Sequence, residues 1–160
     1  HDHLSSENTG KLVSLATKTD RTLFFDFLPV DLGVIRGMRL RQQIYTVPGQ
    51  VYYNSTRKLV LQGVDGVVFV ADSDECRIDA NIEALYNLHE NLSEHGIELS
   101  DVPFVIQWNK RDMPTALPVE ELEHELNPDG HKSFEAIAVK GQGVFDTLKC
   151  VSKEVLHKLS

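Results

Sequence analysis

The chain of 160 residues is 41% hydrophobic and 25% charged, which predicts one globular domain, residues 1–160, with a core of its own. Its 16 basic and 24 acidic residues give a formal net charge of −8, so nucleic acid and anionic membranes are not expected as principal partners. No apolar run is long enough for a membrane span, and Cys76 and Cys150 lack metal-type spacing, which favours a reduced, cytoplasmic protein.

Five segments have the composition of β-strands. The first two in chain order are residues 22–28, an aromatic stretch that ends at Pro29, and residues 40–47. Residues 66–71 (GVVFVA) and 102–108 (VPFVIQW) are continuous apolar runs, which is typical of strands buried on both faces of a parallel sheet. Residues 134–139 form a shorter apolar stretch that predicts the last strand.

Helical patterns lie between and after these strands. Helices are predicted over residues 52–62, 78–96, 118–126 and 144–159. The apolar positions of the longest one fall on a single stripe: Ile78, Ile82, Leu85 and Leu92. The alternation predicts an α/β fold with a doubly wound, mainly parallel sheet and flanking helices. Ligands bind at the carboxyl ends of the strands in such sheets, so the residues that follow each strand are the candidates for function.

The loop after residues 102–108 contains Asn109-Lys110-Arg111-Asp112, an N-K-x-D sequence. A carboxylate at Asp112 can accept hydrogen bonds from N1–H and the exocyclic amine of guanine, whereas adenine offers neither donor and would leave the carboxylate unpaired. The Lys110 stem can lie on the purine face, and Asn109 can bond the base and tie neighbouring loops together. The alternative is a solvated charged turn before Pro114, which its position after a central strand argues against.

A Pro-Gly-Gln sequence follows the predicted strand 40–47. The backbone N–H of Gly49 can approach a γ-phosphate without a side chain in the way, and Gln50 can orient the water that attacks that phosphate. Taken alone, an ordinary Pro-Gly turn between a strand and a helix is the better interpretation. The N-K-x-D loop later in the chain reverses that preference.

Arg21 and Thr22 open the aromatic strand. A threonine hydroxyl there can complete the coordination of Mg²⁺ when a γ-phosphate is present, and the adjacent arginine can stabilise transition-state charge. Without the other two motifs, a strand entry with an exposed arginine would be the preferred interpretation.

These blocks together resemble the MglA-type Ras-like small GTPases of bacterial gliding motility and cell polarity. The resemblance runs through residues 10–73 (GKLVSLATKTDRTLFFDF, YTVPGQVYYN and GVDGVVFVADS), then through NKRD and residues 143–149 (GVFDTLK). It implies a small G-domain that acts as a cytoplasmic switch, binds GTP or GDP with Mg²⁺, hydrolyses GTP and gathers in polar clusters. It also implies an MglB-like roadblock-fold homodimer as GTPase activator, together with polarity and motility effectors.

The resemblance also implies roles for individual residues. The hydrolytic roles are Arg21 as an intrinsic arginine finger, Thr22 as the switch ligand of Mg²⁺, Gly49 as γ-phosphate contact and Gln50 as the residue that positions water. The guanine site consists of Asn109, Lys110 and Asp112, with the backbone N–H of Ala138 directed to the guanine oxygen and Val139 beside it. Most Ras-like proteins have Asp at the position of Thr46, so Thr46 supports the MglA type and weakens the outer support of Mg²⁺.

The resemblance has one departure, at the start of the chain. Ras-like GTPases hold phosphates with a G-x-x-x-x-G-K-[ST] loop, but residues 5–12 (SSENTGKL) have Ser5 in place of the first glycine and Leu12 in place of the hydroxyl residue. Gly10-Lys11 is therefore not expected to bind phosphate. A first strand, this loop and most of a helix, about 30 residues, are expected to precede His1.

Two interpretations of this departure remain. The chain is either an incomplete copy of an active GTPase, impaired by itself, or a natural pseudo-GTPase that serves as a nucleotide-free protein-binding module. Retention of Arg21, Thr22 and Gln50 together with the NKRD sequence favours the first, because a pseudo-enzyme has no chemical need for Gln50. A two-component receiver domain is a third interpretation, but Asp72 and Asp74 do not supply its acidic cluster convincingly.

Overall fold

The computed structural model describes residues 13–15, 25–35, 37–47 and 54–159. The chain divides into two compact units, His1–Val60 and Leu61–Ser160, and each is described by itself. Helix α1 (Asn54–Leu61) crosses the boundary between them, within the predicted range 52–62.

The first unit contains a three-stranded antiparallel sheet of order β1-β2-β3. Strands β2 (Phe25–Ile35) and β3 (Met38–Thr46) form a long hairpin, and β1 (Val13–Leu15) pairs with the start of β2. The predicted strand 22–28 was expected to end at Pro29, which is wrong, because β2 continues through Pro29. Among the described residues β1 reaches only Phe27, so Pro29 has one partner strand, and a proline is tolerated where its nitrogen faces away from that strand.

The hairpin has a bulge where its register shifts between Asp31 and Gly33. Gly33 has φ of +79°, a conformation that glycine adopts without strain, and its N–H donates to Asp31 Oδ1 at 2.9 Å. Arg39 donates to the other carboxylate oxygen through Nε at 3.0 Å and Nη2 at 2.8 Å. The Gly33 N–H and then Arg39 hold the pKa of Asp31 below its ordinary value.

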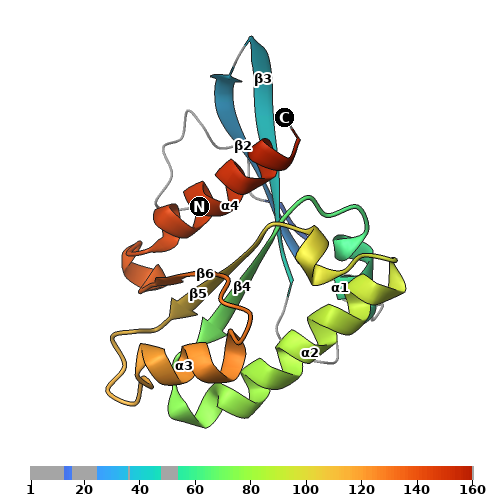
Figure 1. Cartoon of the computed structure of the whole chain (residues 1–160). Coiled ribbons are helices and arrows are strands. Elements are labelled where there is room, and N and C mark those ends of the chain that lie inside the picture. Colours follow the sequence, from blue (N-terminus) through green and yellow to red (C-terminus); the bar gives the residue numbers. More distant parts are fainter. Residues whose placement is uncertain (1–12, 16–24, 36, 48–53, 160) are drawn as a thin grey trace. The chain divides into compact units, whose positions relative to one another are not determined.

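The second unit is built on a parallel sheet of order β4-β5-β6 (Figure 1). Its strands are β4 (Val67–Asp72), β5 (Phe104–Asn109) and β6 (Lys132–Glu135). The α/β fold with parallel strands and flanking helices is thereby confirmed. The predicted strand 134–139 is misplaced: β6 ends at Glu135, and Ala138–Lys140 form a 3-10 turn that ends at Gly141 with φ of +74°.

Helices cover both faces of this sheet. On one face lie α2 (Ile78–Glu94) and α3 (Val119–Leu126), and on the other lies α4 (Val144–Lys158), as Figure 1 shows. A hydrophobic core cluster fills the space between the sheet and the face covered by α2 and α3. Its buried members are Leu61, Ala71, Leu88, Leu92, Leu99, Phe104, Ile106, Trp108, Leu122 and Leu126. No helix of the described residues combines the length and apolar character needed to cross a bilayer.

Two burial expectations need correction. Burial on both faces holds for β5, whose residues are buried up to Trp108, but Val70 of β4 is 53% exposed. Side chains alternate along a strand, so Val67, Phe69 and Ala71 pack against the core cluster and Val70 lies on the opposite face. Ile82, expected on the buried stripe of α2, is 42% exposed, and the adjacent Asn81 is buried instead.

Candidate functional site

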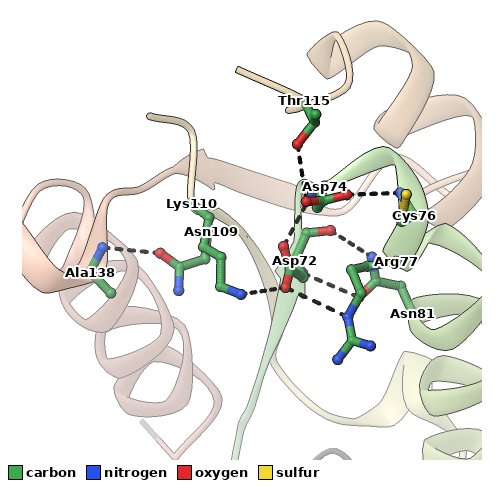
Figure 2. Close-up of polar contacts among 9 residues, drawn as sticks. All are labelled: Asp72, Asp74, Cys76, Arg77, Asn81, Asn109, Lys110, Thr115 and Ala138. Atoms are coloured by element: carbon green, nitrogen blue, oxygen red, sulfur yellow. Dashed lines mark hydrogen bonds and ion pairs between the residues drawn. The ribbon is translucent and has the colours of Figure 1, made fainter. Parts of the chain in front are cut away.

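Polar residues meet at the carboxyl ends of β4 and β5. The two strands stay in register to their last residues, so Asp72 lies opposite Asn109, and the Ser73 N–H donates to the Asn109 carbonyl at 3.0 Å. Figure 2 shows the polar contacts among the residues that follow these strand ends. This is the edge of the sheet at which the sequence predicted a ligand.

The chain turns sharply as it leaves β5. Lys110 has φ of +63°, an uncommon conformation for a residue with a side chain. Hydrogen bonds on both sides hold this turn: the Ala136 N–H donates to the Trp108 carbonyl at 2.7 Å, and the Arg111 N–H donates to the Ala136 carbonyl at 3.1 Å. The N-K-R-D loop is therefore tied to the segment that follows β6.

Asn109 makes the next link between the same two segments. Its Oδ1 accepts a hydrogen bond from the backbone N–H of Ala138 at 3.0 Å (Figure 2). Asn109 thus ties neighbouring loops together, as expected for this side chain. The N–H of Ala138, predicted to face a guanine oxygen, is engaged by Asn109, so that predicted contact stays a prediction.

Lys110 points to the neighbouring strand end. Its Nζ lies 2.6 Å from Asp72 Oδ2, and the side chains are 52% and 18% exposed, respectively. A second cation, Arg77, places its Nε 3.8 Å from the same oxygen. The sequence analysis did not predict that Asp72 pairs with Lys110, although its place at the end of β4 was the available signal.

Asp112 and Val139 lie at the exposed side of the site. The Asp112 side chain is 35% exposed, with Lys140 Nζ 3.3 Å from its Oδ2. Val139 is 84% exposed. Lys140 is a second residue that sequence analysis missed, although it directly follows the predicted Ala138-Val139 pair.

Arg111, the variable position of N-K-x-D, anchors the loop to β6 and to the segment before α3. Its Nε donates to Glu135 Oε2 at 2.9 Å and its Nη1 to the Leu117 carbonyl at 2.6 Å. The Arg111 side chain is only 17% exposed. It therefore fixes the loop against the end of β6.

The loop after β4 is joined to the continuation of the N-K-R-D loop. Glu75 N–H donates to the Thr115 carbonyl at 3.0 Å, and Asp74 accepts hydrogen bonds from the Cys76 N–H at 2.9 Å and the Thr115 hydroxyl at 3.0 Å. These two donors, the Cys76 N–H first, lower the pKa of Asp74 from its ordinary value. These hydrogen bonds join the loop after β4 and the loop after β5 into one surface, called the braced surface below.

The predicted phosphate and metal residues lie outside the described residues; they are Arg21, Thr22, Gly49 and Gln50. Within the ranges that the structure describes, no group of three or more His, Cys, Asp or Glu side chains is placed to hold a metal ion. The described part of the site is thus the part predicted for the purine base. It presents the side chains of Asn109, Lys110 and Asp112 at the carboxyl end of β5.

Comparison with known proteins fixes the family. The model of the ADP-ribosylation factor family matches residues 30–155, most of the chain. This chain is a small GTPase of that family. The matched residues include the whole braced surface around the N-K-R-D loop.

Two relatives refine the placement within the family. The mutual gliding-motility protein MglA of Myxococcus xanthus (strain DK1622) is 56% identical over 159 residues, which are 99% of this chain and 82% of that protein. ADP-ribosylation factor-like protein 6 of Caenorhabditis briggsae is 27% identical over 161 residues, with 93% of this chain and 82% of that protein covered. The expected resemblance to the MglA type is confirmed, and membership of the family implies guanine-nucleotide binding.

Proposed function

We propose that this protein is a GTP-hydrolysing switch that controls bacterial motility and cell polarity. The observation that carries the proposal is the N-K-R-D loop at the carboxyl end of β5, tied to the segment after β6 by the bond between Asn109 and Ala138. The 56% identical relative is named for gliding motility, which supports the motility role. A cytoplasmic protein in polar clusters follows from the same proposal.

In this proposal the described site binds the guanine base. Asp112 accepts hydrogen bonds from N1–H and the exocyclic amine, and its partly exposed carboxylate supports that role. The Lys110 stem covers one face of the ring, while Asn109, Ala138 and Val139 form the wall of the base pocket. An adenine ring would leave the Asp112 carboxylate without these donors, so the site selects guanine.

Hydrolysis in this proposal depends on residues outside the described ranges. Arg21 stabilises transition-state charge, Thr22 binds Mg²⁺, Gly49 contacts the γ-phosphate, and Gln50 orients the attacking water. Magnesium supplies charge neutralisation between the phosphates when it is bound. An MglB-like roadblock homodimer acts as activator, and motility effectors bind the GTP-loaded form.

Single-turnover GTP hydrolysis by the full-length natural protein tests the proposal. Gln50→Leu is expected to slow hydrolysis by about tenfold or more, because a leucine cannot orient water. Gln62→Leu, at an exposed position after α1, is the control and should hydrolyse at the wild-type rate. Equal rates for all three proteins would remove Gln50 from the mechanism, and failure of the wild-type protein to bind GDP would favour the nucleotide-free binding module.

A further inference from the structure

We propose that Asp72 is a positioning residue for guanine-nucleotide binding, which acts by holding the ammonium of Lys110. The inference rests on the proposed function, because it assigns Asp72 to the same base site. Asp72 itself would not touch the nucleotide. It would fix the lysine stem in the plane against which the purine ring stacks.

The geometry between the two side chains supports this assignment. Lys110 Nζ lies 2.6 Å from Asp72 Oδ2, and the two residues leave adjacent parallel strands, since Asp72 pairs in register with Asn109. Lysine has a flexible four-carbon stem, which binds a flat ring well only when its rotamers are restricted beforehand. An ion pair at the far end of the stem supplies that restriction and leaves the methylene groups available for contact.

Asp72 is itself held rigidly by a buried amide. Asn81 of α2, 7% exposed, accepts the Asp72 N–H through Oδ1 at 3.1 Å and donates through Nδ2 to the Asp72 carbonyl at 2.8 Å (Figure 2). Because Ser73 N–H points to β5, these Asp72 groups face away from β5. Asn81 thus pairs with the backbone N–H and carbonyl of Asp72 as a neighbouring strand would. By holding the Asp72 backbone, it fixes the position from which the carboxylate contacts Lys110.

Further contacts orient the carboxylate within this frame. Asp72 Oδ1 accepts the Asp74 N–H at 3.2 Å, so the oxygen that is left for cations is Oδ2. Arg77 Nε lies 3.8 Å from Oδ2 and Lys110 Nζ lies 2.6 Å from it. The shorter and more direct contact belongs to Lys110. Loss of the carboxylate charge would therefore release the lysine first.

The inference makes a distinctive prediction about base selectivity. Asp112 reads the exocyclic amine of guanine, and hypoxanthine lacks that amine while it keeps the same ring faces. Because Asp72 acts only through the contact of Lys110 with the ring face, Asp72→Asn should weaken the binding of GDP and of IDP by the same factor. A general disturbance of the loop would instead move Asp112 as well and change the GDP-to-IDP ratio.

A double-mutant cycle in the full-length protein tests the inference. Dissociation constants for GDP and IDP are measured for wild type, Asp72→Asn, Lys110→Met and the double variant, with thermal unfolding followed by Trp108 fluorescence. Asp72→Asn should weaken GDP by about tenfold, the loss expected of one partly exposed charge-assisted contact. In the Lys110→Met background it should add less than about twofold, because the group through which it acts is gone.

Two further variants make the result specific. Asp72→Glu, which restores the charge on a longer arm, should return the GDP dissociation constant to within about threefold of wild type. Glu154→Gln removes an ion pair of the same 2.6 Å length, to Lys132, at the amino end of the sheet and should leave GDP binding unchanged.

The outcomes separate the inference from the proposed function. Multiplicative effects of Asp72→Asn and Lys110→Met, an unchanged GDP affinity in Asp72→Asn, or a shifted GDP-to-IDP ratio would each overturn the inference while guanine binding stands. A wild-type protein that does not bind GDP would overturn both. If Asp72→Asn does not fold, Asp72→Ser, which also removes the charge, decides the same question when it is compared with wild type in both lysine backgrounds.

Discussion

In the proposed function base recognition depends on Asp112, and Lys140 forms an ion pair with its carboxylate. The 3.3 Å contact between Lys140 Nζ and Asp112 Oδ2 keeps the carboxylate directed toward the segment after β6. A carboxylate has two oxygens and about four acceptor positions, so it can keep this contact while it accepts two guanine donors. Lys140 therefore supports recognition without competing for it.

Removal of the Lys140 charge is expected to have a small effect. Lys140→Met should weaken GDP binding by no more than about fivefold, because exposed ion pairs contribute about 0.2–1 kcal/mol. The effect should shrink at high salt, where such pairs are screened, and should vanish in an Asp112→Asn background. Equilibrium titration with a fluorescent GDP analogue measures it, and tighter binding or a loss beyond tenfold would contradict this account of the pair.

Asp74 makes the free energy of unfolding depend on pH in the acid range. Its pKa lies below the ordinary value because the folded protein donates the Cys76 N–H and the Thr115 hydroxyl to its carboxylate. A carboxyl group with a lowered pKa in the folded state stabilises the fold above its unfolded-state pKa, about 3.9, and that contribution is lost as the pH falls through the folded value.

Replacement of Asp74 by asparagine removes the carboxylate and with it this pH-dependent stabilisation. Asp74→Asn should lower the free energy of unfolding at pH 7 and should reduce its decline between pH 5 and pH 3. Urea denaturation at a series of pH values measures both, with Asp65→Asn as a control at an exposed carboxylate. Parallel stability curves for wild type and Asp74→Asn below pH 5 would show that the Thr115 bridge does not sense protonation.

At the scale of elements, the segment from β6 to α4 determines whether the base site keeps its shape. Gly143, just before α4, has φ of +74°, and a Cβ there would lie 2.1 Å from the Glu135 carbonyl oxygen and 2.9 Å from the Ala136 Cα. Ala136 holds both sides of the Lys110 turn. A side chain at position 143 would therefore displace backbone that the N-K-R-D loop depends on.

Gly143→Ala should destabilise the fold more than the backbone angle alone explains. Gly130→Ala is the matched control, because Gly130 has φ of +70° but nothing within 4 Å of the added Cβ. The control should cost about 1–2 kcal/mol for the left-handed angle, and Gly143→Ala should cost more and weaken GDP binding. Denaturation followed by the sole tryptophan, Trp108, measures the difference, and equal losses would contradict the steric argument.

The sequence predicted elements well where burial governs the pattern. The apolar runs before Asp72 and Asn109 are parallel strands, as continuous apolar runs predict, although burial on both faces is complete only for β5. The sequence-based prediction was wrong where tertiary pairing overrides the local preference of a residue for strand or turn. Pro29 is accommodated inside β2 because, among the described residues, only β3 pairs with that part of the strand. β1 is too short to carry a pattern, and β6 starts earlier than its apolar residues.

At the scale of the whole molecule, the site joins residues that are distant in sequence. Asp72, Asn109 and Ala138 come together because the carboxyl ends of parallel strands share one edge. The N-K-R-D sequence was recognisable because guanine demands fixed side chains at fixed spacing. Asp72, Asn81 and Lys140 were not predicted as partners, because ion pairs and amide clamps between strands and helices leave no local pattern.

We propose that Asp112 recognises guanine, and an exchange of base specificity tests this most directly. Xanthine carries a carbonyl where guanine carries its exocyclic amine, so an amide at position 112 can donate to the base that a carboxylate rejects. Affinities for GDP and XDP are measured for the wild-type full-length protein and for Asp112→Asn. We predict that wild type prefers GDP by about a hundredfold or more and that Asp112→Asn prefers XDP; equal affinity of the wild type for the two nucleotides, or an unchanged preference in the variant, would contradict the account.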